Sequence, residues 1–199
     1  MVKELSIGVI GIQGARSEHI GSMQNVLKET NTPGKVFIVK HKEDIDTIDA
    51  LILPGGESTT ISRILYNSGL YDAISERIKK RNLPIMGTCA GCVILASELL
   101  NDSKDVKLLN AIDMQVERNA FGRQKESFEQ IIEIKDFSEH FNAVFIRAPE
   151  IKKVWNKCEI IATLDKKIVM VRQDNMLALS FHPELTDDLR VHKYFLDMI

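Results

Sequence analysis

The sequence predicts an α/β fold, in which a mostly parallel open sheet is flanked by helices and carries an antiparallel extension. The first half of the chain alternates short apolar runs with helical patterns, which is typical of a parallel sheet wrapped by helices. From about residue 108 the pattern changes to strands of period two. A chain of 199 residues is long enough for one well-packed domain and short for two, so residues 1–199 are expected to form a single domain.

Apolar runs and their flanking residues locate the elements of each half. In the parallel half we expect strands at residues 5–11, 35–40, 50–54 and around Ile85, and helices at 17–29, 59–81 and 91–100. The helix at 59–81 contains Asn67-Ser68-Gly69, and a break is expected there because these residues are poor helix formers. In the second half we expect strands at residues 112–117, 128–134, 143–146, 159–162, 168–172 and 176–181, and a final helix at 187–198.

The composition argues against several classes of partner. A formal net charge of −2 and a pI near 6.2 disfavour a nucleic-acid-binding protein, which needs a basic face. The chain leads from Met1 into a short strand, so we expect neither a signal peptide nor a membrane span. Three cysteines without disulfide spacing favour a reducing compartment and hence a cytoplasmic protein. Cys89 and Cys92 alone are too few for a structural zinc site.

Cys89 is the strongest candidate for a catalytic residue. It follows a short apolar strand, and an apolar helical pattern begins directly after it. A thiol at the start of a helix lies near unpaired backbone N–H groups, which favour the thiolate and can hold an oxyanion. Gly91 is expected to allow a tight turn, which would give the strand, nucleophile and helix order of the serine hydrolase elbow. The alternative is a small cysteine that packs in a glycine-rich turn.

A later apolar strand, at residues 177–181, leads directly to a base and an acid. His182 and Glu184 follow it, although a His-Pro pair after a strand often only terminates the strand. Sites in open α/β sheets gather at the carboxyl ends of the strands, where a thiol, an imidazole and a carboxylate could meet. We therefore interpret Cys89, His182 and Glu184 as a catalytic triad.

The segment at residues 53–60 is a second candidate for the site. Its glycines would let a ligand approach the main chain, and the hydroxyl residue at position 58 or 59 could cap the next helix. If the segment lies beside the thiol, the N–H groups of Gly56 and Ala90 could donate to an oxyanion, and Glu57 could bind an ammonium group. The alternative is a plain turn between strand and helix.

Polar residues after other strands complete the candidate site. Arg118 and Arg147 follow strand ends, and a guanidinium beside a pocket is suited to clamp a carboxylate, although most such arginines are solvated surface charge. Gln13 follows the first strand and lies either near the site or in a plain turn. Four histidines show no partner pattern and are interpreted as surface or helix residues: His19, His41, His140 and His192.

The motifs resemble those of a known family. Gly87-Thr88-Cys89-Ala90-Gly91 together with His182-Pro183-Glu184 is similar to the triad signature of class I glutamine amidotransferase domains. Four further runs resemble, more specifically, the glutaminase subunit of the two-component pyridoxal 5'-phosphate synthase: Gly11-Ile12-Gln13-Gly14, Pro54-Gly55-Gly56-Glu57-Ser58-Thr59, Glu117-Arg118-Asn119-Ala120-Phe121-Gly122-Arg123-Gln124 and Phe145-Ile146-Arg147-Ala148-Pro149. The chief departure is Cys92, which stands where the family usually has an aliphatic residue.

The resemblance implies a class I glutamine amidotransferase-like, flavodoxin-like fold and the hydrolysis of L-glutamine to L-glutamate and ammonia. Cys89 would form a γ-glutamyl thioester, while His182, oriented by Glu184, would transfer protons. The oxyanion donors it implies are the N–H groups of Gly56 and Ala90. The glutamine-binding residues it implies are Gly56, Glu57, Ser58, Arg118, Ile146 and Arg147.

The resemblance also implies a partner. The ammonia would pass to a TIM-barrel synthase subunit, in a hetero-oligomer that makes pyridoxal 5'-phosphate, with Gln13 near the interface and no cofactor or metal in this chain. Three alternatives remain: the glutaminase of another synthase, such as the histidine-pathway imidazole glycerol phosphate synthase; a cysteine hydrolase or stress sensor on a similar sheet; and a non-catalytic binding subunit. Residues 117–124 and 145–149 argue against the first, His182-Pro183-Glu184 against the second and the intact triad against the third.

Overall fold

The computed structural model describes residues 4–100, 105–118, 120 and 127–199. The strands are β1 (Leu5–Ile10), β2 (Gly34–Val39), β3 (Ala50–Leu53), β4 (Ile85–Thr88), β5 (Ala96–Leu99), β6 (Ile112–Glu117), β7 (Ser127–Ile132), β8 (Phe141–Ile146), β9 (Glu150–Val154), β10 (Glu159–Leu164), β11 (Lys167–Gln173) and β12 (Met176–Leu179). The helices are α1 (Arg16–Glu29), α2 (Ser58–Asn67), α3 (Leu70–Lys79), α4 (Ala90–Leu95) and α5 (Arg190–Leu196), with 3-10 turns η1 (Lys42–Thr47) and η2 (Pro183–Leu185).

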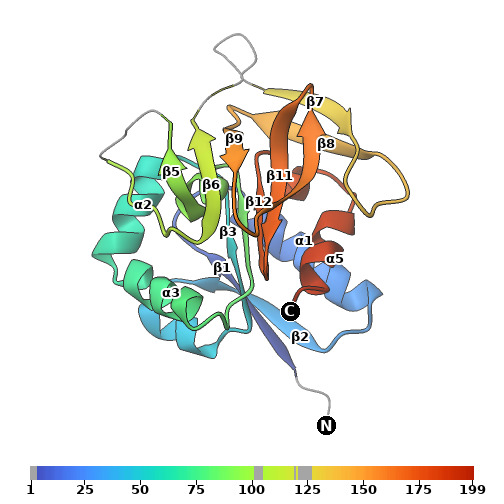
Figure 1. Cartoon of the computed structure of the whole chain (residues 1–199). Helices are drawn as coiled ribbons and strands as arrows, with labels where there is room; N and C mark the ends of the chain where they lie inside the picture. The colour runs from blue at the N-terminus through green and yellow to red at the C-terminus, as the bar shows by residue number, and fades with distance from the viewer. Residues whose placement is uncertain (1–3, 101–104, 119, 121–126) are drawn as a thin grey trace.

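A large mixed sheet forms the centre of the described residues (Figure 1). Its order is β2-β1-β3-β4-β12-β11-β9-β6-β5, with β10 paired to β11, while β7 and β8 form a separate two-stranded sheet. The pairings from β2 through β12 are parallel, and β11 and β9 continue the sheet in antiparallel fashion. The predicted class, a mostly parallel sheet with flanking helices and an antiparallel extension, is confirmed.

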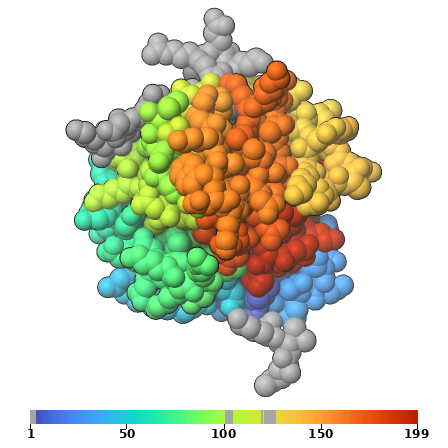
Figure 2. Space-filling view, viewed as in Figure 1, coloured from blue at the N-terminus to red at the C-terminus, as the bar shows by residue number. Residues whose placement is uncertain are grey.

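Two apolar layers cover the two faces of the sheet. Alternate residues of a strand point to opposite faces, so Leu51 and Leu53 pack with α2, α3 and α4, whereas Ile52 packs with α1, α5 and β8. Figure 1 shows α1 and α5 side by side, away from α2 and α3, and in Figure 2 the orange strands β9 and β11 lie at the surface between the green and yellow segments. In the described part of the chain, no helix has the length and apolar character needed to cross a membrane.

Local pattern and structure differ in two elements. The helix expected at 91–100 ends at Leu95, where the chain becomes extended and Ala96 pairs with Ile112 in β6. The pairing with a distant strand overrides the helix propensity of these residues. The strand β9 was not expected from the sequence, because its exposed lysines interrupt the apolar pattern. The expected break near Gly69 is confirmed, because α2 ends at Asn67 and α3 begins at Leu70.

Gly91 lies inside α4, so the expectation that it forms a tight turn was wrong. A Cβ atom at this position would lie 2.1 Å from the carbonyl oxygen of Leu53. The missing side chain therefore lets α4 pack directly on the backbone of β3. This close contact places the start of α4, and Cys89 before it, next to the loop that follows β3.

We expect Gly91→Ala to destabilise the protein by about 1–3 kcal/mol, the usual cost of overpacking a tight site. Gly21→Ala is a matched control, because a Cβ there would meet nothing within 4 Å and the residue lies inside α1. Alanine should stabilise that helix position by roughly 0.5–1 kcal/mol. Urea unfolding followed by circular dichroism measures both changes. Equal midpoints for the two variants would contradict this explanation of Gly91.

Candidate active site

The site is built where the central parallel strands end. Thr88, the last residue of β4, pairs with Leu179, the last residue of β12, and the N–H of Cys89 donates a hydrogen bond of 2.8 Å to the carbonyl of Leu179. The N–H of His182 donates a 2.8 Å bond to the carbonyl of Val144 in β8. The strand pairing and the Cys89 bond hold the ends of β4 and β12 side by side at the carboxyl edge of the sheet, and the His182 bond ties the residues after β12 to β8.

Cys89 stands on the sharp bend that the sequence predicts. Its backbone has φ 49° and ψ −102°, and it is the N-cap residue of α4. A non-glycine residue in such a sparsely populated conformation costs about 1–3 kcal/mol, which the surrounding structure must offset. The side chain is nearly buried, and its thiol donates a hydrogen bond to the carbonyl of Ile146 with an S···O distance of 3.7 Å.

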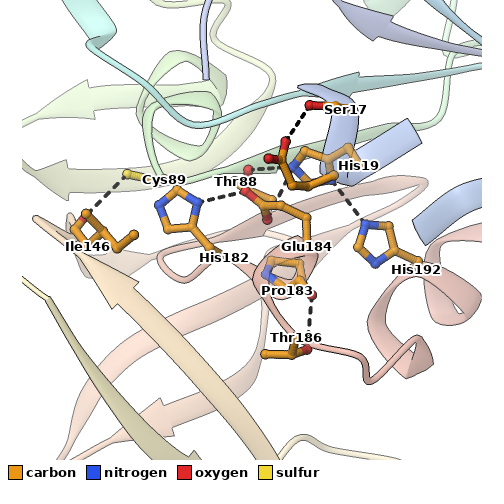
Figure 3. A network of polar contacts seen from close by, with 11 residues as sticks. Ser17, His19, Thr88, Cys89, Ile146, His182, Pro183, Glu184, Thr186 and His192 are labelled. Atoms are coloured by element: carbon orange, nitrogen blue, oxygen red, sulfur yellow. Dashed lines mark hydrogen bonds and ion pairs between the residues drawn. The ribbon is translucent and has the colours of Figure 1, made fainter. Parts of the chain in front are cut away.

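The His182 ring lies between Cys89 and Glu184 (Figure 3). Nδ1 of His182 is 2.8 Å from Oε1 of Glu184, and both side chains are buried. Burial disfavours the charged imidazole, but hydrogen bonds with Cys89 and Glu184 outweigh it and raise the pKa of His182 to about 10. Burial also works against the Glu184 carboxylate, yet His19 and His182 hold its pKa below the usual range.

A cavity of about 310 Å³ opens over this line of residues. It brings together nearly all the side chains and backbone groups that the sequence analysis selected: Gly56, Glu57, Ser58, Cys89, Ala90, Arg118, Ile146, Arg147 and His182. Gly55 covers the imidazole so closely that a Cβ would lie 2.5 Å from Cε1 of His182. Among the described residues no group of three or more His, Cys, Asp or Glu side chains is arranged to hold a metal ion.

Two predicted site residues do not line the cavity. Glu184 lies behind His182, as an orienting acid should, and Gln13 lies behind the loop that follows β3. The Gln13 side-chain oxygen accepts a 3.2 Å hydrogen bond from the N–H of Glu57. Of the run at 117–124, Asn119 and residues 121–124 lie outside the described residues, so only its beginning can be placed.

Glu57 and Arg118 form an ion pair at the cavity, with Nη2 of Arg118 3.1 Å from Oε1 of Glu57. The other carboxylate oxygen of Glu57 caps α2 by accepting from the N–H of Thr60 at 2.8 Å and from the hydroxyl of Thr59. The cap expected from position 58 or 59 is therefore supplied by Glu57. Partial burial opposes its charge, but the bonds from Thr59 and Thr60 lower the pKa of Glu57 to about 2.

His19 and His192 lie in helices, as one of the two expectations had it, but neither is a surface residue and both have polar partners. Both side chains are fully buried, and His19 reaches Glu184 from the side opposite His182. A signal for their burial existed, because His19 falls on the same helical stripe as Met23 and Val26, and His192 on that of Phe195. The sequence carries no comparable signal for the polar contacts of the two histidines. These contacts connect α1, α5 and η2, which lie far apart in the sequence.

We expect the His182 imidazole to titrate near pH 10, and Glu184→Gln to bring its pKa down towards the ordinary 6.5 because the carboxylate that stabilises the charged ring is lost. A raised pKa means that the charged ring stabilises the fold fully below pH 6.5 and ceases to do so as the pH rises through about 10. NMR titration of the ring signals measures the pKa. The same titration in wild type and Glu184→Gln would contradict the coupling.

The comparisons with known proteins agree with this geometry. A family model described as the SNO glutamine amidotransferase family matches residues 9–199. The pyridoxal 5'-phosphate synthase subunit PdxT of Methanococcoides burtonii is 47% identical over 199 residues, covering 98% of this chain and 99% of that protein. The protein of the same name from Pyrococcus horikoshii is 44% identical over 193 residues, covering 96% and 98% respectively.

Solved structures extend the agreement to three dimensions. A crystal structure of a glutamine amidotransferase that is 41% identical superposes with a TM-score of 0.86 and covers 96% of this chain and 97% of its own. The structure of PurLQS from Thermotoga maritima, at 13% identity and a TM-score of 0.68, shares the fold. The resemblance found in the sequence motifs is thus confirmed, and this chain belongs to the SNO glutamine amidotransferase family.

Proposed function

We propose that this chain is the glutaminase subunit of a pyridoxal 5'-phosphate synthase, and that it hydrolyses L-glutamine to L-glutamate and ammonia. The observation that carries the proposal is the line from Cys89 and His182, which border one cavity, to Glu184 behind the imidazole. The names of the relatives from Methanococcoides burtonii and Pyrococcus horikoshii support the choice of synthase over the other glutaminases considered.

In the first chemical step the Cys89 thiolate attacks the side-chain amide carbon of glutamine. A bond forms between sulfur and carbon while the carbonyl electron pair moves to oxygen, and the N–H groups of Gly56 and Ala90 are the proposed donors to this oxyanion. Both residues border the cavity beside the sulfur. Because Ala90 is the first residue of α4, its N–H has no partner inside the helix.

In the second step His182 donates its proton to the amide nitrogen, and the carbon–nitrogen bond breaks to release ammonia. The neutral ring then takes a proton from water, and the resulting hydroxide attacks the thioester carbon, which gives glutamate and returns the thiolate with a protonated ring. The raised pKa of His182 keeps the ring protonated at the start of this cycle. Glu184 stabilises that charge and fixes the orientation of the ring.

Substrate binding uses the two charged groups at the cavity. The carboxylate of Glu57 binds the α-ammonium group of glutamine, and Arg118, with Arg147 and the backbone of Ile146, binds the α-carboxylate. Because Glu57 and Arg118 pair with each other in the free chain, each group exchanges one charged partner for another when glutamine enters. The low pKa of Glu57 keeps it ionised for this role across the physiological range.

The ammonia passes to a TIM-barrel synthase subunit, and contact with that subunit completes the oxyanion site. Gly56 has φ +142°, a region open to glycine, so its peptide can reorient at little steric cost. The side chain of Gln13 accepts a hydrogen bond from the N–H of Glu57 in this loop. Binding of the synthase subunit at Gln13 would therefore change the conformation of the loop. Free ammonia is largely protonated at neutral pH, so direct transfer preserves the nucleophile.

Cys89→Ala should abolish glutamine hydrolysis, with a loss of at least about a thousandfold in kcat, because the nucleophile is gone. Cys92→Ala is the matched control. Burial raises the pKa of the Cys92 thiol, and its side chain packs in the apolar layer, so alanine should leave most of the activity. Ammonia release and circular dichroism measure activity and folding. If Cys92→Ala were as inactive as Cys89→Ala, the assignment of the nucleophile would fail.

Addition of the synthase subunit from the same organism should raise kcat/KM for glutamine by at least about tenfold. This is less than the roughly 100- to 1000-fold rate effect of one complete oxyanion donor. Gln13→Ala should weaken this activation more than it lowers the melting temperature. A coupled assay of glutamate formation, with and without the partner, measures the effect. Full activity of the isolated chain together with no binding of the synthase subunit would contradict the proposed pathway role.

A further inference from the structure

The second oxygen of Glu184 faces a pair of buried histidines that the proposed mechanism does not use (Figure 3). Nε2 of His19 lies 3.3 Å from Oε2 of Glu184 and 3.2 Å from Oγ1 of Thr88, the residue before the nucleophile. Nδ1 of His19 lies 3.1 Å from Nε2 of His192. The line of polar groups therefore continues from Cys89 through the triad to α1 and α5.

Burial keeps both histidines uncharged. It lowers the pKa of His19, although Glu184 acts in the opposite direction, and it lowers the pKa of His192 to about 3. A neutral imidazole carries one N–H, so the single proton between the two rings belongs to one of them. The position of that proton decides whether His19 presents an N–H or a lone pair to Glu184.

Two independent features select the same arrangement. If His19 carried its proton on Nδ1, its Nε2 lone pair would face the Glu184 carboxylate at 3.3 Å, which is repulsive. The proton of His192 would then sit on Nδ1, an atom without a hydrogen-bond partner among the described residues, and a buried unpaired N–H is rarely tolerated. With both protons on Nε2, His192 donates to His19, and the Nε2–H of His19 donates to Oγ1 of Thr88. Oε2 of Glu184, which accepts no hydrogen bond among the described residues, lies 3.3 Å from the same nitrogen.

We propose that His19 is a positioning residue for the reaction: its polar Nε2–H, close to the otherwise unpaired Oε2 of Glu184, attracts that oxygen so that Oε1 stays aligned with His182, while His192 selects the tautomer of His19. This inference rests on the proposed glutaminase function for its kinetic consequence. The geometry itself requires no substrate. Oγ1 of Thr88 accepts the hydrogen bond from this N–H and so ties His19 to β4, the strand directly before Cys89.

The kinetic test compares His19→Leu with His19→Gln. Leucine removes the donor, whereas the glutamine amide places an N–H near the position of Nε2. We expect His19→Leu to lower kcat about 10- to 100-fold, as loss of an orienting partner does elsewhere, with KM nearly unchanged, and His19→Gln to recover most of the loss. Activity is measured with the synthase subunit present. An unchanged kcat in folded His19→Leu would overturn the proposal.

The pH profile gives a readout that simple destabilisation would not move. The Glu184 carboxylate is faced by His182 and by His19 from α1, with Thr88 from β4, Glu18 and His192 around His19. Without the His19 N–H the buried carboxylate is less stabilised, and the pKa of Glu184 rises. The acid limb of kcat/KM should therefore move to higher pH in His19→Leu and stay in place in His19→Gln.

The role of His192 is tested in both backgrounds. His192→Leu should lower kcat in the wild-type chain, because the tautomer of His19 is no longer selected. In the His19→Gln background the same change should have much less effect, because an amide donor has no tautomer to select. Equal losses in both backgrounds would mean that His192 acts through packing alone, and would overturn this part of the proposal.

Nitrogen NMR of the imidazole rings tests the inference without any variant and without activity. The wild-type chain should show His19 and His192 as neutral rings protonated at Nε2 around neutral pH. A His19 ring protonated at Nδ1 would overturn the proposal even if every variant failed to fold. If the rings have the expected tautomers but the wild-type complex releases no ammonia from glutamine, the proposed function fails and the positioning geometry stands.

Discussion

The parallel pairing of β4 with β12 is the constraint on which the site depends. It places Thr88 beside Leu179, so the residues that follow each strand leave the sheet together at one edge. The bond from the N–H of Cys89 to the Leu179 carbonyl holds that register at the point where the chain turns into α4. A slip of one residue would turn the side chains of β12 to the opposite face and separate thiol from imidazole. The apolar layers on both faces oppose such a slip, because each strand residue fits only one of them.

Burial and neighbouring groups then determine which of His182, Glu184 and His19 carry a charge. An isolated carboxylate at the depth of Glu184 would be strongly disfavoured, but an imidazole on each side compensates it. The two neighbours differ in charge: His182, beside the cavity, has a raised pKa, whereas His19, beneath the acid, is kept neutral. One carboxylate thus stabilises the charged ring of His182 beside the cavity and lies next to an uncharged ring on the other side.

Much of this arrangement could be predicted from short segments, because each of them carries its own signal. Cys89 stands between an apolar strand and an apolar helix, and the glycines after β3 mark a chain turn, so local pattern and strand-end geometry were sufficient to group these residues. The parts that escaped prediction depend on distant partners. The helix that starts at Ala90 stops after Leu95 only because β6 offers a partner strand to Ala96. Similarly, nothing local to His19 indicates that α5 and η2 bring a second imidazole and a carboxylate against it.

The ion pair between Glu57 and Arg118 gives the cavity a means of discrimination. In the proposed binding mode, a ligand with only a positive charge would compete with Arg118 for Glu57, and a simple acid would compete with Glu57 for Arg118. A zwitterion replaces both halves of the bond at once, so its entry leaves the number of charge pairs higher than before. An amine or a dicarboxylate without an α-amino acid head group would therefore break the pair and replace only one half of it, whereas a free amino acid would replace both. In the proposed binding mode the pair would thereby select for an α-amino acid head group.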